Sequence, residues 1–385
     1  MPVDLTQLRP RVKPEHAPYR LGADRIRIGG ASYGIAAEII DPDGFVWSLL
    51  QAMDGTHSVA DIVAQAVRSH PDRREPVVRA AVEQLVRSGY VEDAAAPDPS
   101  GLTERDKQRH DRARGYYRWL DLTSRESTWE PQARLRRARV TIVGAGGTGG
   151  IAALALAAAG VGQLHCVDPD VVELSNLSRQ VLYTEDDIGT AKADAAVARL
   201  SRLNTDICVT AGRQRITSAR DVAPLARDCD VLLLSADEPP DVRVWTNRAC
   251  LAAGRPWVDC GYHGPLIQVA AYVPGQGGCW ECLHDASRER QLAGGAHPHD
   301  AQERGLAVAG ATAAVPAGIS GYLAAHQVIA LITGVPPVTP GVIQAVNLAA
   351  LEAPFTFRDR PARPCPACGY VPGDRPGDRG ERVAS

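Results

Sequence analysis

The sequence has no surplus of positive charge. Its 42 Lys and Arg stand against 45 Asp and Glu, a formal net charge of -3, so it has no excess of cations to neutralise a nucleic-acid backbone. We therefore expect no nucleic acid among its partners. The N-terminal segment MPVDLTQLRPRVKPEH also lacks the apolar region of a secretory signal, and we expect a cytoplasmic location.

An uninterrupted hydrophobic segment of membrane-spanning length is missing as well. The longest apolar stretch covers residues 305–334, where Pro316, several glycines and the pair His326 and Gln327 interrupt it. A helix that spans a bilayer needs roughly 20 consecutive, mainly apolar residues. This stretch instead predicts a pair of buried helices, and we expect no membrane partner.

Nine cysteines are many for a chain expected in a reducing compartment, where metal binding or catalysis explains them better than disulfides. Four of them form two CxxC pairs, Cys279 with Cys282 and Cys365 with Cys368. Four thiolates predict a closed tetrahedral zinc site of structural type, whereas a redox role would need only one pair. The other five are expected in the core: Cys166, Cys208, Cys229, Cys250 and Cys260.

A chain of 385 residues exceeds the usual size of one hydrophobic core, which predicts two domains. Residues 15–95 contain two β-like runs and three helical patterns, typical of a small α+β domain, with a capping box of Ser58 and Asp61 before one helix. Residues 96–137 are a linker and an Arg-rich helical arm. Residues 138–369 form the larger domain, and the polar, Gly- and Pro-rich tail 370–385 is expected to be disordered.

In the larger domain, strand and helix patterns alternate. This alternation predicts an α/β fold with a Rossmann-like, mostly parallel sheet. The expected elements are strands at 139–143, 162–167 and 231–235 and helices at 147–159 and 191–203.

A glycine motif follows the first strand of this domain. GAGGTG opens a helix, so its backbone N–H groups can face phosphate; its glycines are Gly144, Gly146, Gly147 and Gly149. Asp168 ends the next strand, where a carboxylate can bind a ribose hydroxyl. These residues alone also suit NAD or FAD. The cations Arg179 and Lys192 further along favour a triphosphate instead.

Over residues 105–368 the sequence resembles the ThiF/MoeB/ubiquitin-activating-enzyme superfamily. The resemblance lies in GAGGTG, ELSNLSRQ, IGTAK, SADE, NRACLAAGRPWVDCG and the two CxxC pairs, in that order. It implies a Rossmann-like sheet with an adenylating-enzyme C-terminal extension and a zinc knuckle of four cysteines. It also implies an adenylyltransferase that uses ATP and Mg²⁺ and works as a homodimer.

The resemblance carries roles for individual residues. Asp168 matches the residue that binds the ATP ribose, and Asn176, Arg179 and Lys192 match residues that hold or polarise the phosphates. Asp237 matches the ligand of Mg²⁺ near the α-phosphate. Charge neutralisation of this kind is what the departure of pyrophosphate requires.

Two positions depart from the family pattern. Glu238 follows Asp237 where Asn is usual. Arg112 fits the second Arg of an RxxR arm that reaches the triphosphate across the dimer interface, but Ala113 follows it where Gln is usual. Arg112 is therefore equally interpretable as a solvated arginine of a basic arm.

A thiol is absent where some relatives carry one. The segment 304–310, RGLAVAG, contains no cysteine, so thioester or persulfide chemistry is not expected there, and Cys260 is interpreted as the end of a strand. The segment 283–303 is similar to the family's flexible crossover loop over the substrate tail. Its His284, His297 and His299 are expected in solvent.

Residues 19–93 resemble PqqD-like leader-recognition domains, chiefly in FVWSLLQAMDGTHSVADIV and in a winged-helix order of elements. Such domains bind a precursor peptide by adding it as a strand. The fusion is similar to MccB-like peptide-adenylating enzymes of ribosomal peptide natural-product maturation. It predicts adenylation of a precursor-peptide carboxylate. The alternatives are adenylation of a small ThiS/MoaD-like sulfur carrier protein and a non-catalytic docking partner of a cyclodehydratase.

Overall fold

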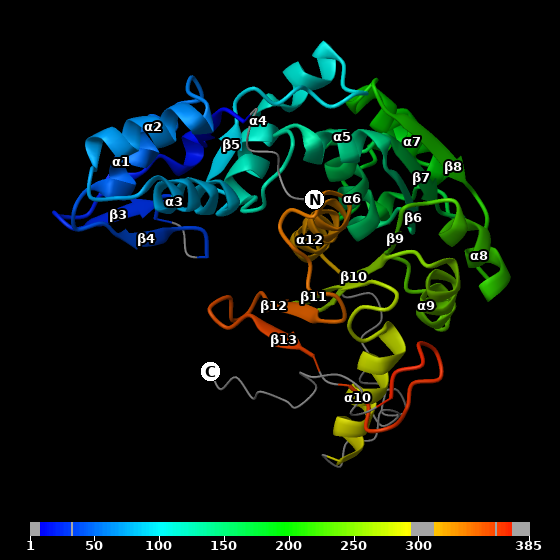
Figure 1. Cartoon of the computed structure of the whole chain (residues 1–385). Coiled ribbons are helices and arrows are strands. Elements are labelled where there is room, and N and C mark those ends of the chain that lie inside the picture. Colours follow the sequence, from blue (N-terminus) through cyan, green and yellow to red (C-terminus); the bar gives the residue numbers. More distant parts are fainter. Residues whose placement is uncertain (1–7, 32–33, 294–311, 359, 372–385) are drawn as a thin grey trace. The chain divides into compact units, whose positions relative to one another are not determined.

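The computed structural model describes residues 8–31, 34–293, 312–358 and 360–371. The chain divides into two compact units, residues 1–134 and 135–385, and the boundary falls inside helix α5, Glu130–Arg137 (Figure 1). The predicted domain limits at 15–95, 96–137, 138–369 and 370–385 remain predictions. Most of the tail predicted to be disordered lies outside the described residues.

The first unit combines two small antiparallel sheets with three helices. Strand β1 pairs with β5, and the second sheet has the order β2-β3-β4. The predicted capping box is confirmed, because Ser58 and Asp61 exchange hydrogen bonds at the start of α2. The elements are β1 Pro10–Val12, β2 Tyr19–Arg20, β3 Arg25–Ile28, β4 Ala37–Ile40, α1 Phe45–Ala52, α2 Val59–Ser69, α3 Glu75–Arg87 and β5 Val91–Asp93.

The buried face of α3 carries Val78, Val82 and Val86, which are spaced by four residues. These side chains pack with α1 and α2 in one apolar cluster. The neighbouring Val77 is exposed instead. Adjacent residues of a helix point about 100° apart, so Val77 and Val78 cannot both face the centre of the cluster.

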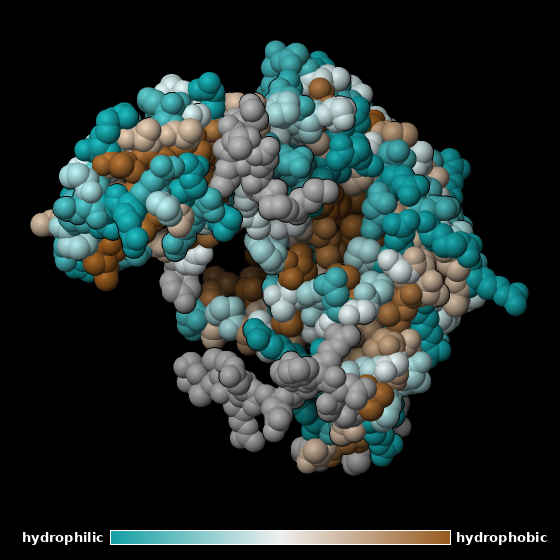
Figure 2. Space-filling view, in the orientation of Figure 1, coloured by the Kyte–Doolittle hydropathy of each residue, from teal (hydrophilic) through white to brown (hydrophobic). Residues whose placement is uncertain are grey.

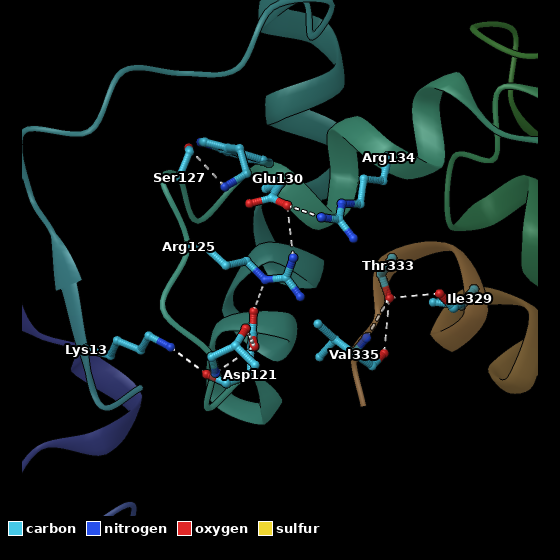
Figure 3. A network of polar contacts seen from close by, with 11 residues as sticks. Lys13, Asp121, Arg125, Ser127, Glu130, Arg134, Ile329, Thr333 and Val335 are labelled. Atoms are coloured by element: carbon cyan, nitrogen blue, oxygen red, sulfur yellow. Dashed lines mark hydrogen bonds and ion pairs between the residues drawn. The ribbon is translucent and has the colours of Figure 1, made fainter. Parts of the chain in front are cut away.

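The Arg-rich arm is helical in two parts instead of one. Helix α4, Glu104–Leu120, ends at Asp121, and α5 begins at Glu130. Ion pairs stabilise the connection, because Arg125 contacts the Asp121 carboxylate and donates to Glu130 over 3.1 Å (Figure 3). Lys13 donates to the Asp121 carbonyl over 2.6 Å, which ties the end of α4 to the chain after β1.

The second unit is built on one eight-stranded sheet with the order β13-β12-β11-β10-β9-β6-β7-β8. The five strands from β10 to β8 are parallel, and β11, β12 and β13 extend the sheet in antiparallel pairs. The predicted Rossmann-like, mostly parallel α/β sheet is therefore confirmed. The strands are β6 Arg139–Val143, β7 Gln163–Val167, β8 Cys208–Gly212, β9 Val231–Leu234, β10 Trp257–His263, β11 Leu266–Tyr272, β12 Ile343–Asn347 and β13 Phe355–Phe357.

The helices of this unit pack in two groups, α6 with α7 and α12, and α8 with α9. Right-handed crossovers place connecting helices on both faces of such a sheet. Helix α10 corrects one expectation. Residues 283–303 were predicted to form a crossover loop, but residues 283–293 are helical. Residues 294–311 lie outside the described residues. The helices are α6 Gly147–Ala158, α7 Lys192–Leu203, α8 Ala219–Arg227, α9 Val242–Ala253, α10 Trp280–Ala293 and α12 Ala314–Thr333.

Helix α12 is the described part of the apolar stretch for which the sequence predicted a pair of buried helices. It is the one described helix long and apolar enough to cross a membrane, a test that the core helix of a globular domain also passes. It packs against α6, β10 and β11, and Thr148 and Ser320 share a hydrogen bond of 2.7 Å. Its last turn is closed by the Thr333 hydroxyl, which contacts the backbone of Ile329 and Val335 (Figure 3).

The contact between α12 and α6 requires glycine at position 321. A Cβ there would stand 2.6 Å from the Ile151 Cβ and 2.6 Å from the Thr148 carbonyl oxygen. We predict that Gly321→Ala lowers the free energy of unfolding by about 1–3 kcal/mol because a packed interface must open. Gly318→Ala, in the same helix with open space around it, should be neutral or slightly stabilising. Equal effects in urea denaturation would contradict this packing.

Candidate functional site

The glycine turn lies where the strand order of the sheet reverses. Strands β6 and β9 are neighbours, and in open α/β sheets ligands bind outside the carboxyl ends of such a pair. Gly144 has φ of 93°, and a Cβ on it would stand 2.8 Å from the Ala236 amide nitrogen after β9. A Cβ on Gly149 would collide with the Gly144 carbonyl and the Ser235 hydroxyl. The turn is therefore as close to β9 as backbone permits, and it presents the N-terminus of α6.

Asp168 lies buried at the end of β7, where its carboxylate shapes the turn. One oxygen accepts the Ala145 N–H over 2.7 Å and the other accepts the Asp170 N–H over 3.0 Å. Burial raises the pKa of this carboxyl despite those two bonds. Each carboxylate oxygen can accept a second hydrogen bond, so Asp168 can hold the loop and a ribose hydroxyl together.

The segment from Asn176 to Tyr183 packs directly on the glycine turn. The Tyr183 hydroxyl donates to the Ala145 carbonyl over 2.8 Å, and the Arg179 carbonyl lies 3.5 Å from the position of a Cβ on Gly147. The buried Asn176 side chain accepts the Glu173 N–H over 3.1 Å, which fixes the start of the segment. These contacts place Arg179 beside the N-terminus of α6, where a bound anion is stabilised.

Lys192 is the first residue of α7, and only 8% of its side chain is exposed. Its Nζ lies 3.4 Å from an Asp170 oxygen, and Arg215 contacts the other oxygen of Asp170 over 3.1 Å. The Tyr183 hydroxyl also reaches the Lys192 carbonyl over 3.3 Å. A single tyrosine therefore joins the glycine turn to the predicted phosphate-binding lysine.

Asp237 follows β9 and extends into solvent, with 82% of its side chain exposed. Its Oδ1 accepts from Arg243 over 2.8 Å, and the Arg243 Nε contacts both oxygens of Asp259 over 3.1 and 3.2 Å. The Asp259 charge raises the pKa of Arg243, which stays cationic, while burial raises the pKa of Asp259. Two carboxylates share one cation here, so a second cation would be electrostatically favoured.

A cavity of about 630 Å³ adjoins Asp237. Its floor is the face of β10 and β11, and its wall is one side of α10, because the lining positions of that helix repeat every three or four residues. Burial raises the pKa of Tyr262 in the floor, on which the charges of Arg179 and Asp237 also act. The wall residues are Trp280, Leu283, His284, Ser287 and Arg290.

The four cysteines of the CxxC pairs come together although the two pairs stand far apart in the sequence. Their sulfur atoms all lie within 4.8 Å of one another. Three pairs of sulfur atoms are separated by 3.7, 3.8 and 3.5 Å, close to the roughly 3.8 Å edge of a tetrahedral site with zinc–sulfur bonds near 2.3 Å. The Cys282 thiol lowers the pKa of Cys279 to about 5, which favours a thiolate. The donor set fits a structural zinc ion.

The remaining cysteines divide into two kinds. Cys166, Cys229, Cys250 and Cys260 are buried, as expected, but Cys208 is exposed on β8, which corrects its placement in the core. β8 is the edge strand of the parallel half, and only Gly212 among its five residues is buried. Burial holds the pKa of Cys260 well above its usual value, which makes it a poor nucleophile at neutral pH.

The structure brings together the predicted residues of the second unit, from the glycine turn to Asp237. Arg112 belongs to the first unit, where it lies exposed on α4. Sequence reasoning missed Tyr183, Arg243 and Asp259. The sequence offered one signal for Arg243, which lies in the first turn of the helix after Asp237. Its pairing with Asp259 could not be predicted, because that residue lies on the neighbouring strand β10.

The comparisons with known proteins agree with this geometry. The model described as ThiF family matches residues 119–368. The adenylyltransferase and sulfurtransferase MOCS3 of Sus scrofa is 37% identical over 243 residues, which are 63% of this chain and 50% of that protein. The sulfur carrier protein ThiS adenylyltransferase of Escherichia coli is 35% identical over 241 residues, 62% of this chain and 88% of that protein. The chain thus spans half the length of the first relative.

One solved structure resembles nearly the whole chain. The crystal structure of E. coli MccB with AMPCPP and MccA has a TM-score of 0.72 and 21% identity, covering 94% of this chain and 99% of that chain. At this identity the likeness describes the fold alone. The named relatives are adenylyltransferases, so the prediction of an enzyme of this class is confirmed at the level of the family. With its glycine turn, its cysteine cluster and a family match over residues 119–368, the chain belongs to the ThiF family.

Proposed function

We propose that this chain uses ATP to adenylate a carboxylate of a ribosomally made precursor peptide, in the biosynthesis of a peptide natural product. One observation carries the proposal: an anion-binding helix N-terminus, a buried lysine and an exposed carboxylate lie around the carboxyl ends of adjacent parallel strands, beside a large cavity. ATP would occupy the turn, and the substrate carboxylate would enter from the cavity.

The reaction forms one bond and breaks another at the α-phosphorus. A carboxylate oxygen of the substrate attacks this phosphorus, the bond to the bridging oxygen breaks, and pyrophosphate leaves with the electron pair. Negative charge grows on the departing group. In this proposal Lys192, Arg179 and the first N–H groups of α6 would stabilise that charge, while Asp168 would orient the ribose.

Asp237 fits the role of a Mg²⁺ ligand. Within the described part of the chain Arg243 contacts only its Oδ1, which leaves Oδ2 for a cation, and carboxylate oxygens together with phosphate oxygens are the usual ligands of this ion. Mg²⁺ bound there would offset the phosphate charge. Glu238, which stands where the family usually has Asn, is exposed.

The cavity supports a peptide with side chains as the substrate. Trp280 and Asp259 line one end, and Arg290 stacks on Phe357 ten residues further along α10 than Trp280, about 15 Å away by helix rise. That length matches about four or five extended residues. A Gly-Gly tail would leave much of the 630 Å³ unfilled.

The first unit offers a place for the leader segment of such a peptide. Strand β4 is the edge of its three-stranded sheet, and no partner pairs with its outer side among the described residues. Ile40 on this strand is 76% exposed. Figure 2 shows hydrophilic and hydrophobic residues mixed on the visible face of the molecule. A peptide added along β4 would gain main-chain hydrogen bonds and cover this side chain. This supports the PqqD-like, leader-binding interpretation.

Adenylation of a sulfur carrier protein is the second candidate. The E. coli relative named for ThiS, at 35% identity, favours it. The sequence lacks a thiol at 304–310, and Cys260 is buried, so the later transfer of sulfur through an enzyme thiol has less support. The nucleophile that consumes the acyl-AMP is then a group outside these cysteines.

We also propose a homodimer. Large apolar side chains are exposed within and on either side of the segment that packs on the glycine turn: Val171, Leu174, Val181 and Ile188. A second copy seated there would bury this patch beside the nucleotide site. Arg112 of one copy could then complete the site of the other, as the family resemblance implies.

The first prediction concerns ATP–pyrophosphate exchange by the purified protein. Exchange should depend on the precursor peptide, and Lys192→Ala should lower its rate by about 100-fold because one preorganised cation is lost. Arg199→Ala, which removes an exposed cation from the same helix, serves as the control and should behave as wild type.

The substrates separate the candidates in the same assay. Peptide-dependent exchange that weakens when the leader is removed, or in Ile40→Asp, supports leader binding by the first unit. Exchange only with a Gly-Gly carrier protein would establish the second candidate. A folded protein that binds the peptide but catalyses no exchange with either substrate would contradict adenylation and favour the docking-partner interpretation.

The cysteine cluster predicts one tightly bound zinc ion per chain. Cys365→Ser should lose that ion and unfold at a lower temperature, because zinc joins two distant parts of the second unit. The matched control is Cys208→Ser, which alters an exposed thiol outside the cluster. Elemental analysis and thermal denaturation provide the measurements; zinc retained by Cys365→Ser would remove this cysteine from the site.

The dimer predicts an effect of charge at the exposed apolar patch. Leu174, 67% exposed, should become buried on association, so Leu174→Asp should shift sedimentation from dimer toward monomer. Leu351→Asp alters a residue of similar exposure away from the patch and should leave the dimer intact. A wild-type chain that sediments as a monomer at all concentrations would refute the proposed assembly.

A further inference from the structure

Helix α9 touches two sites that the proposed function treats separately. Arg243 in its first turn binds Asp237, the proposed ligand of Mg²⁺, and Asn247 contacts the cysteine cluster. The two residues are four positions apart, so they stand one turn from each other on the same face of the helix. A movement of α9 at one site is therefore transmitted to the other.

The Arg243 end determines where Asp237 can point. Asp237 is exposed, and its one side-chain contact among the described residues is the bond from Arg243. Arg243 in turn is anchored by two bonds to Asp259 in β10, whose side chain is only 17% exposed. A guanidinium with a planar fork and two fixed partners leaves little freedom for the carboxylate that it holds.

The Asn247 end is fully buried and uses both of its polar atoms on the loop that begins α10. Its Nδ2 donates to the Cys279 sulfur over 3.6 Å and to a Glu281 oxygen over 3.0 Å, and its Oδ1 accepts the Trp280 N–H over 3.2 Å. A bond of this kind to a ligand sulfur orients the ligand, and the ligand orients Asn247.

The contacts close into a ring. The Trp280 side chain lowers the pKa of Asp259, which holds Arg243, while the Trp280 backbone N–H donates to Asn247. The cysteine loop, α9 and β10 thus each contact the other two. Because these three elements are linked to one another, a shift of one requires a shift of the others. The geometry of the four sulfur atoms and the orientation of Asp237 therefore depend on each other.

We propose that Asn247 and Arg243 are positioning residues through which the metal-loaded cysteine cluster sets the affinity of Asp237 for a divalent cation. The proposal rests on the proposed function only in taking Asp237 as a cation ligand. It assigns the cluster a second role, since loss of its metal loosens the loop at Cys279 and Trp280 and, through α9, weakens cation binding at Asp237.

The test measures cation binding directly. Mn²⁺ is titrated into the full-length, zinc-loaded protein with AMPCPP, and free Mn²⁺ is followed by electron paramagnetic resonance. Asn247→Ala keeps all four cysteines and should retain zinc while the Kd for Mn²⁺ rises roughly tenfold or more, as for other supports of metal ligands. An unchanged Kd in a zinc-loaded Asn247→Ala would overturn the proposal.

A matched control uses the next residue of the helix. Arg248 also contacts Glu281, over 3.0 and 3.1 Å. In the described chain it makes no hydrogen bond to a cysteine, to Asp237 or to Asp259, and it interacts with Cys365 through charge alone. Arg248→Ala should leave the Kd for Mn²⁺ unchanged. An increase equal to that of Asn247→Ala would mean that any damage to the loop suffices, and it would refute the specific path through α9.

A second variant covers the case in which Asn247→Ala loses zinc or does not fold. Arg243→Lys keeps the charge but cannot contact Asp237 and Asp259 with two separate N–H groups, so the Kd for Mn²⁺ should rise with zinc content unchanged. Withdrawing zinc from the folded wild type with a chelator should raise the same Kd, and adding zinc back should restore it. A Kd that does not respond to either change disproves the coupling.

Failure of the proposal is distinguishable from failure of the proposed function. If the protein catalyses no ATP–pyrophosphate exchange but Asn247→Ala and zinc removal still change the Kd for Mn²⁺, the coupling holds and the proposed adenylation is wrong. A chain with normal exchange and no such effects retains the adenylation and loses the coupling. If Asp237→Ala binds Mn²⁺ as wild type does, Asp237 is not the ligand and the coupling is wrong.

Discussion

The close approach of the glycine turn to the end of β9 is the contact on which the rest of the second unit depends. With no Cβ at Gly144 or Gly149, the turn lies against Ser235 and Ala236, and the Ser235 hydroxyl donates to the Gly144 carbonyl over 2.6 Å. This contact brings the N-terminus of α6 and the residue Asp237 to adjacent strand ends. One side chain at either glycine would separate the proposed phosphate-binding and cation-binding groups.

The charged side chains around the glycine turn are fixed by contacts with neighbouring elements. The cations and carboxylates around the turn are each held by a second element: Lys192 by Asp170 after β7, Asp168 by backbone N–H groups, and Arg243 by Asp259 in β10. Each anchor lowers the conformational freedom that nucleotide binding would otherwise have to remove. The negative charge of Asp237 and Asp259 exceeds the single positive charge of Arg243, so a further cation beside Asp237 would balance the charge.

The sequence predicted three of the five parallel strands, β6, β7 and β9, because each is a short apolar run, and glycine or aspartate follows the first two. The glycine turn, the strand ends and the joining of the cysteine pairs followed from local patterns and family motifs. Helix α10 did not, because its polar composition between Trp280 and Ala293 lacks a clear apolar period and is stabilised by the cysteine loop at its start. The position of Cys208 depended on strand order, which a single strand pattern does not reveal.

The order of charges along the cavity constrains how a peptide would lie in it. The end at Asp237 and Asp259 is acidic and suits a carboxylate only once a cation is bound there, whereas His284 and Arg290 on α10 are the basic groups further along the wall. A substrate that placed its carboxylate beside Arg290 instead would set the reacting oxygen about 15 Å of helix rise away from Trp280 and Asp259. In the proposed reaction, cation occupancy at Asp237 would therefore determine the direction of the peptide as well as the charge at the α-phosphorus, and a chain without that cation would bind its substrate in the unproductive direction.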